Sequence, residues 1–298
     1  MSSYRLRHPR PDEAGAAARV YIDHEVGLYG ATTYTPADLE VEWSELDLGR
    51  DVWVAVDETG VVGYATLHDR GELYRGEAYA VAHEVRLGIV ELLEETAAER
   101  GARRFQIGVL ERDEPGRLLL EERGYRPVRI FREMRIELDA PPAPAGLPDG
   151  LRLEDFDPAD ARAFHAAQQE GFSDHWEFHP RPFDEWTKFH IGNEHFDATL
   201  WNVVRDGDEI AAGTINVAPF AGGGWVQVLF TRRPWRGRGV GGALLQDSFR
   251  RFWEHGYRTV GLAVDSESDT GAFRVYERAG MRTALGWQMY ERELERVA

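Results

Sequence analysis

The sequence of 298 residues contains no cysteine, which excludes disulfide bonds, thiolate metal sites and a cysteine nucleophile. Long apolar runs are absent as well, because no stretch approaches the roughly 18 apolar residues that a membrane-spanning helix requires. The first residues, Met1 to His8, lack the apolar core of a signal peptide. We therefore expect a soluble, cytoplasmic protein with no membrane partner.

Positive charge is scarce, since 35 Lys and Arg face 52 Asp and Glu and the formal net charge is −17 at pH 7. Such a chain repels polyphosphate backbones, so we expect no nucleic-acid partner. The same field favours encounter with a cationic substrate such as an amine. A merely solubilising acidic surface explains the charge equally well.

A proline-rich segment divides the chain. Four prolines between Asp139 and Gly150 break every hydrophobic period and make this segment a stiff connector. A chain of this length with 43% apolar residues is expected to form two domains. We place them at residues 1–139 and 151–298, joined by a linker at 140–150.

The predicted elements follow the same order on both sides of the linker. The first half shows helices beginning at 14 and 35, strands at 52–56, 61–67 and 77–81, a helix at 87–100, a strand at 104–109, a helix at 115–123 and a strand at 128–138. The second half shows helices beginning at 157 and 182 and strands at 200–204, 210–217 and 225–230. We infer a duplicated α/β domain, each copy a mixed, largely antiparallel sheet flanked by helices.

A basic, glycine-rich turn joins the last of these strands to an apolar helix, between Phe230 and Leu245. Glycines at 237, 239, 241 and 242 remove Cβ atoms where backbone N–H groups must approach a ligand closely. Arg236 and Arg238 add donors of the kind that pair with phosphate oxygens. The segment is therefore interpreted as a phosphate-binding loop.

Two classes of ligand fit such a loop. Gly237, Gly239 and Gly242 satisfy the spacing of the dinucleotide fingerprint, and Asp265 stands where that fingerprint places an acid. Only 33 residues follow Asp265, however, which is too few for the remaining strands of a doubly wound sheet. A nicotinamide cofactor is therefore the weaker interpretation.

The stronger interpretation comes from a family resemblance. Arg236-x-x-Gly239-x-Gly241 resembles the pyrophosphate-binding motif of the GCN5-related N-acetyltransferases (GNAT), and the segment from Tyr276 to Met281 resembles the second signature of that family. The resemblance implies two tandem GNAT-like domains, similar to the group that includes mycothiol synthase. It also implies acetyl-CoA as co-substrate.

The resemblance implies roles for individual residues. Tyr276 matches the tyrosine that protonates the thiolate of CoA, a task that suits a phenol with a pKa near 10. Thr270 or Ser268 replaces the usual asparagine, capping the next helix and contacting the cofactor. The expected cofactor-binding residues are Leu229, Phe230, Thr231, Arg236, Gly237, Arg238, Gly239, Val240, Gly241, Gly242 and Thr270.

The first half lacks these features. Its segment from Ala82 to Leu93 carries one glycine and two acids, and Leu120 stands at the position of Tyr276. Bulky side chains block a close approach of pyrophosphate, and carboxylates repel it. We therefore expect residues 1–139 to be a degenerate, non-catalytic copy that helps to shape the substrate cleft.

The general base is left open by the sequence, because Trp225 to Val228 contain no carboxylate. Candidates for contact with the substrate amine are Asp174, His175, Glu177 and His179, although each is also explained as an ordinary polar surface residue. His175 and His179 lack a third ligand at recognisable spacing, so no metal is expected.

Three functions are compatible with the sequence. The first is an N-acetyltransferase that moves an acetyl group from acetyl-CoA to a primary amine of a small molecule in the C-terminal domain. The second is a non-catalytic, acyl-CoA-binding regulatory module, and the third is a nicotinamide-dependent oxidoreductase. A monomer is favoured over a dimer, because the fused copies supply each other's interface.

Overall fold

The computed structural model describes residues 4–44, 46–144, 146–192, 196–268 and 270–294. The chain forms two compact units, one of Met1–Phe131 with Leu285–Ala298 and one of Arg132–Ala284. Among the described residues, no helix is both long and apolar enough to cross a bilayer.

The first unit is a sheet in the order β1-β2-β3-β4-β5-β12, antiparallel except for β4 and β5. Its elements are β1 (Arg5–Arg7), α1 (Ala14–Tyr29), α2 (Pro36–Ser44), β2 (Val52–Asp57), β3 (Gly60–Arg70), β4 (Leu73–Ala80), α3 (His83–Glu99), β5 (Arg104–Leu110), α4 (Glu114–Glu122) and part of β12 (Arg282–Glu293). Local chemistry explains several boundaries. At the start of α2, for example, both the backbone N and Oγ1 of Thr35 lie 2.7 Å from Oδ2 of Asp38.

The second unit is a sheet in the order β6-β11-β10-β9-β8-β7, which is the arrangement of the first unit given from its opposite edge. Its elements are part of β6 (Arg126–Glu137), β7 (Leu151–Asp155), α5 (Ala161–Phe172), α6 (Phe183–His190), β8 (Asn202–Asp206), β9 (Glu209–Phe220), β10 (Gly223–Thr231), the 3-10 turn η4 (Arg233–Trp235), α7 (Val240–Glu254), β11 (Thr259–Asp265) and α8 (Ala272–Arg278). The predicted fold class, two tandem α/β domains with mixed sheets, is confirmed.

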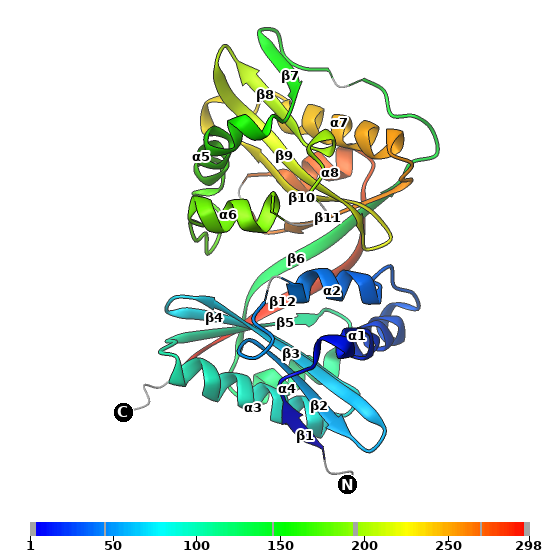
Figure 1. Ribbon diagram of the computed structural model, residues 1–298, viewed down its shortest axis with the longest axis vertical. Coiled ribbons are helices and arrows are strands. Elements are labelled where there is room, and N and C mark those ends of the chain that lie inside the picture. The colour runs from blue at the N-terminus through cyan, green and yellow to red at the C-terminus, as the bar shows by residue number, and fades with distance from the viewer. Residues whose placement is uncertain (1–3, 45, 145, 193–195, 269, 295–298) are drawn as a thin grey trace. The chain divides into compact units, whose positions relative to one another are not determined.

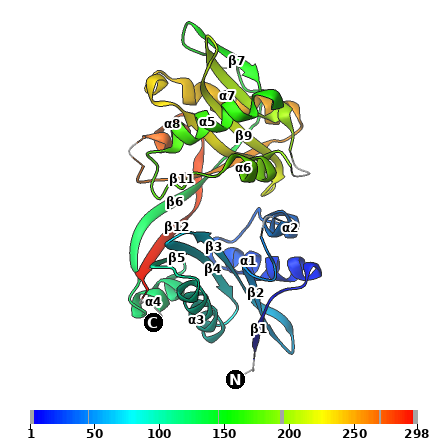
Figure 2. The ribbon, with the colours of Figure 1, turned by 60° about the vertical axis from the view of Figure 1, so that its left-hand side comes forward.

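The limits of the compact units differ from the predicted domain limits 1–139 and 151–298. The reason is that each unit contains the last strand of the other repeat. In the first unit, β12 pairs with β5 from Trp287↔Leu110 to Glu293↔Arg104. In the second, the end of β6 lies beside β11, and the N–H of Leu138 donates to the carbonyl of Arg258 at 2.7 Å. Strands β6 and β12 therefore contribute residues to both units (Figure 2).

Helices cover both faces of the second sheet (Figure 1). Helices α5 and α6 lie on one side of β8 to β10, where the rings of Phe164 and Phe230 meet edge to face at 5.2 Å. Helix α7 lies on the other side, where Phe252 packs so closely on Gly224 that a Cβ there would be 2.4 Å from the ring. These aromatic contacts fix both helix layers against β10, the strand that leads into the glycine loop.

Candidate active site

The glycine loop connects β10 to α7 through two left-handed residues. Gly237 has φ = 72° and Gly239 has φ = 85°, values that side-chain-bearing residues rarely adopt. Apart from the glycine itself and its two chain neighbours, no described atom lies within 4 Å of the place where a Cβ of either glycine would be. The conformation therefore requires glycine, and the space above the loop is open.

The loop presents free backbone donors at the start of α7. The first main-chain bond there runs from the N–H of Ala243 to the carbonyl of Gly239 at 3.1 Å. The N–H groups of Val240, Gly241 and Gly242 precede it and have no intrahelical acceptor, and no described side chain caps this helix. Together with the helix dipole, they form a site suited to the diphosphate of a nucleotide cofactor.

The two strands beside the loop part from each other. Strand β10 pairs with β11 only at Gly224 and Trp225, although it continues beside β9 as far as Thr231. From Val226 onward, one backbone edge of β10 is therefore not bonded to β11, all of whose residues are described. This edge contains Leu229, Phe230 and Thr231, so it can receive an extended ligand arm in the manner of an added strand.

Tyr276 lies on α8 and is 7% exposed. Its ring belongs to the hydrophobic cluster that also contains Val226, Phe230 and Val264 of the two parting strands. Burial raises the pKa of Tyr276 to about 12, so its hydroxyl keeps its proton at neutral pH. The side chain is therefore suited to donate a proton to a nearby anion.

Helix α8 begins differently from the expectation. Its N-cap is Gly271, with φ = 72°, rather than Thr270 or Ser268. Thr270 is exposed, and its hydroxyl lies 2.9 Å from that of Ser268. The predicted cap is wrong, because the left-handed turn at Gly271 sets the start of the helix, and contact between Thr270 and a cofactor stays a prediction.

Arg236 is held by the end of α5. Its guanidinium donates to both carboxylate oxygens of Asp174, at 2.5 and 3.0 Å, and to the carbonyls of Gly171 and Thr231 at 2.8 and 2.9 Å. The side chain thus joins α5 to the start of the loop. A direct bond from this guanidinium to phosphate stays a prediction, and it would compete with Asp174.

The comparisons with known proteins agree with this geometry. Residues 161–281 match the model of the Acetyltransferase (GNAT) family. A mycothiol acetyltransferase of Propionibacterium freudenreichii is 30% identical over 239 residues, which cover 76% of this chain and 73% of that protein. The chain belongs to the GNAT family of acetyltransferases.

Solved structures show the same tandem architecture. A GCN5-related N-acetyltransferase from Sphaerobacter thermophilus is 30% identical with a TM-score of 0.83, over 98% of this chain and 96% of that one. A tandem GNAT protein from the clavulanic acid biosynthesis pathway shares the fold at 13% identity, with a TM-score of 0.74 over 98% and 99% of the two chains. The chain is thus a GNAT-type acyltransferase, a class that uses acetyl-CoA.

The remaining predicted contacts of this GNAT domain lie in the segment between α5 and α6. The ring of His175 lies 4.3 Å from that of Phe172, and burial lowers the pKa of His175. Glu177 has φ = 51°, and its carbonyl lies 2.8 Å from Nδ1 of the exposed His179. The described residues contain no group of three or more His, Cys, Asp or Glu that could hold a metal.

One residue beside the site was not predicted from the sequence. Gln227 is exposed on β10, in the part of this strand that no longer pairs with β11. The available signal was a lone glutamine between two valines.

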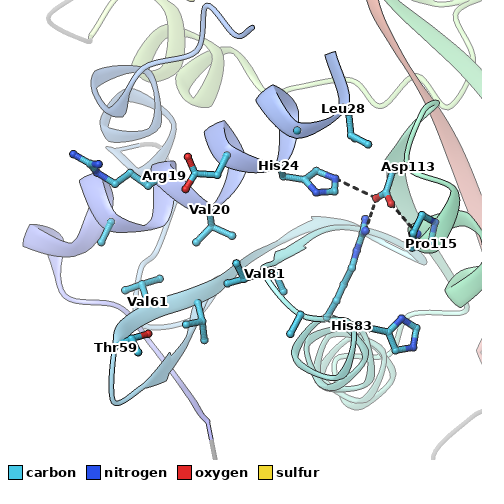
Figure 3. A pocket seen from close by; sticks show the side chains of 18 of the residues that line it. Arg19, Val20, His24, Leu28, Thr59, Val61, Val81, His83, Asp113 and Pro115 are labelled. Atoms are coloured by element: carbon cyan, nitrogen blue, oxygen red, sulfur yellow. Dashed lines mark hydrogen bonds and ion pairs between the residues drawn. The ribbon is translucent and has the colours of Figure 1, made fainter. Parts of the chain in front are cut away.

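The first GNAT-like domain has a cavity of about 960 Å³ at the corresponding place, beyond the end of β4 and at the start of α3 (Figure 3). Here α3 follows Ala82 in an extended conformation, without a left-handed glycine. Arg86 pairs with Asp113, and Nε2 of His24 lies 3.1 Å from the same carboxylate. The Arg86–Asp113 ion pair and the neighbouring His24 thus occupy the place where the second domain has free main-chain N–H groups.

The contact between Arg236 and Asp174 predicts an acid-sensitive part of the stability. Hydrogen bonding by Arg236 lowers the pKa of Asp174, so this contribution is present above the ordinary aspartate pKa and is lost as the pH falls below it. We expect Asp174→Asn to lower the melting temperature at pH 7, with the gap to wild type narrowing progressively as the pH falls below about 4.

Thermal melts across this pH range test the expectation, with Asp149→Asn as the matched control. Asp149 is exposed in the linker, so its substitution should leave the melting curve unchanged at every pH. A gap between wild type and Asp174→Asn that stays constant with pH would contradict the role of the ion pair.

Proposed function

We propose that the C-terminal GNAT domain transfers the acetyl group of acetyl-CoA to a primary amine of a small molecule. The observation that carries the proposal is the left-handed glycine loop at the start of α7, beside the freed edge of β10. In this proposal the loop binds the diphosphate of acetyl-CoA, and the strand edge binds the pantetheine arm of the same molecule. The domain at residues 151–298, completed by the end of β6, thus supplies the chemistry.

The residues present fit acetyl-CoA. Backbone N–H groups from Gly237 to Gly242 bind the diphosphate, whereas the N–H of Arg236 already donates to the carbonyl of Arg233. The backbone of Leu229 to Thr231 binds the pantetheine arm. Acetyl-CoA supplies an activated thioester whose C–S bond breaks as the C–N bond forms. Tyr276 gives its proton to the departing sulfur, and the acceptor nitrogen loses one proton to solvent or to a base.

The acceptor amine is assigned to the α5–α6 face of β10. Asp174, His175, Glu177 and His179 lie in the segment that joins these helices and stay candidate contacts. Asp174 is already paired with Arg236, so among them it supports the loop more directly than the substrate. The first domain, whose cavity contains the Arg86–Asp113 pair, is proposed to be non-catalytic.

A spectrophotometric assay of free thiol, run with acetyl-CoA and a panel of small amines, tests the proposal. We expect amine-dependent release of CoA, together with calorimetric binding of acetyl-CoA and no binding of NADH. Binding of acetyl-CoA with no thiol release for any amine would instead support a regulatory module. Failure to bind acetyl-CoA would refute the assignment of the loop.

A further inference from the structure

The cavity of the first domain combines an apolar part with a polar end. The apolar part lies between α1, the start of β3 and the end of β4, where Val20 faces Val61 and Val81 (Figure 3). Val81 is 72% exposed, so the lining leaves a large apolar side chain uncovered. The volume of about 960 Å³ is that of a ligand pocket, which is typically apolar with a few polar groups gathered at one place.

The polar end is organised around Asp113, the N-cap of α4. Its Oδ1 accepts from the N–H of Gly116 at 2.9 Å, and its Oδ2 accepts from the guanidinium of Arg86 and lies 3.1 Å from Nε2 of His24. A Cβ at Gly116 would overlap Asp113 and Arg86, so this packing requires glycine there. Both carboxylate oxygens are thus already engaged, which disfavours a cationic ligand.

Arg86, by contrast, keeps unused donors. It is 8% exposed, and Asp113 is its only hydrogen-bond acceptor among the described residues. None of its nitrogen atoms is buried without a partner, so those that do not bond to Asp113 are open to the cavity that Arg86 lines. A guanidinium in this position can bind an anion through the N–H groups that remain.

The start of α3 adds donors at the same end. The first main-chain bond of this helix runs from the N–H of Arg86 to the carbonyl of Ala82 at 3.1 Å, and no described side chain caps the helix. The N–H groups of His83, Glu84 and Val85 therefore have no intrahelical acceptor, and the helix dipole favours a negative charge beside them. Since Ala82 and His83 line the cavity, a ligand inside it can reach this helix end.

The charge of such an anion is limited by its surroundings. Burial would raise the pKa of Asp113, but hydrogen bonding by His24 and the charge of Arg86 lower it overall, so the carboxylate stays ionised at neutral pH. Glu84 adds a second acid in the first turn of α3. Both acids repel a diphosphate more strongly than a singly charged group.

We propose that this cavity binds an aliphatic carboxylate. The carboxylate head accepts hydrogen bonds from Arg86 and from the start of α3, and the aliphatic chain packs on the valine side chains of α1 and β3. The site differs in chemistry from the glycine loop of the second domain, and its occupation does not depend on acyl transfer.

Calorimetric titration of the full-length chain with octanoate, octanamide and octylamine tests the head group, since the three ligands share one chain length and differ in charge. We expect octanoate to bind about tenfold to hundredfold more tightly than octanamide, the effect of a hydrogen bond to a charged group. Octylamine should bind more weakly than octanamide. Hexanoate should bind about tenfold more weakly than octanoate, because it buries two CH₂ groups fewer.

Gly27→Phe tests the location. Gly27 lies on α1 in the cavity lining, and beyond its own helix backbone and chain neighbours no described atom lies within 4 Å of the place where its Cβ would be. The new ring should fill part of the cavity and weaken octanoate binding by about tenfold or more. Gly15→Phe is the matched control, because Gly15 lies on the same helix with equally open surroundings but outside the lining, and it should bind octanoate as wild type does.

Arg86→Gln tests the contact with the head group. It removes the charge and keeps an amide that can donate to Asp113, so it should abolish the preference for octanoate over octanamide. Arg103→Gln, which breaks an exposed ion pair with Glu72 in the same unit, is the control and should keep the preference. A ratio of two dissociation constants measured on one sample does not depend on the folded fraction, so partial unfolding cannot imitate this result.

Three results would overturn the inference: equal affinity of wild type for octanoate and octanamide, unchanged octanoate binding in Gly27→Phe, and loss of octanoate binding in Gly239→Asp. The last variant changes only the glycine loop of the second domain, so such a loss would place octanoate at the loop. Octanoate binding that survives in Gly239→Asp while acetyl-CoA binding is lost supports two separate sites. Failure of acetyl-CoA to bind to wild type refutes the proposed function and leaves this inference intact.

Discussion

Replacing Gly239 by aspartate is expected to weaken acetyl-CoA binding by about 100-fold or more, which corresponds to about 2.7 kcal/mol. The backbone at this position has φ = 85°, and the space over it is open. A new side chain would therefore point into the volume assigned to the diphosphate, where its carboxylate repels phosphate charge. The N–H groups of Val240 and Gly241 would also lose their approach to the ligand.

Calorimetric titration with acetyl-CoA measures this effect, and Gly256→Asp is the matched control. Gly256 has φ = 90°, and apart from its chain neighbours no described atom lies within 4 Å of the place where its Cβ would be. It follows the opposite end of α7. The backbone strain is thus similar, and the binding loop is untouched. Equal affinity of Gly239→Asp and Gly256→Asp would refute the loop as the cofactor site.

Tyr276→Phe is expected to lower kcat by about 100-fold to 10,000-fold with little change in acetyl-CoA affinity, the usual contribution of a positioned general acid. The ring is buried in the core cluster, so phenylalanine preserves its packing while it removes the proton. A steady-state thiol assay and a calorimetric titration separate the two effects. Tyr257→Phe, in the same unit near the end of α7, is the control and should keep full activity.

The pH dependence gives a second check on Tyr276. Burial raises its pKa to about 12, so the acid form persists while the pH rises through the neutral and mildly alkaline range. Any loss of wild-type activity below about pH 10 should therefore also be seen in Tyr276→Phe, because it comes from a group other than Tyr276. If Tyr276→Phe has an unchanged kcat, Tyr276 is only a core residue.

The sequence by itself determined the local elements and the loop. Left-handed turns at Gly237 and Gly239 require glycine whatever surrounds them, so their spacing was visible in the chain. Caps such as Thr35 with Asp38 are equally local, which is why element types and the repeat were predicted correctly. The family motifs likewise lie within short contiguous segments.

Only the tertiary structure decided which distant groups meet. Asp174 and Arg236 are 62 residues apart, and nothing in either segment shows that the carboxylate takes the guanidinium. The exchange of the last strands between the two units is of the same kind. The physical reason is that hydrogen-bond donors and strand edges are chemically alike along the chain, and only folding brings one particular pair within bonding distance.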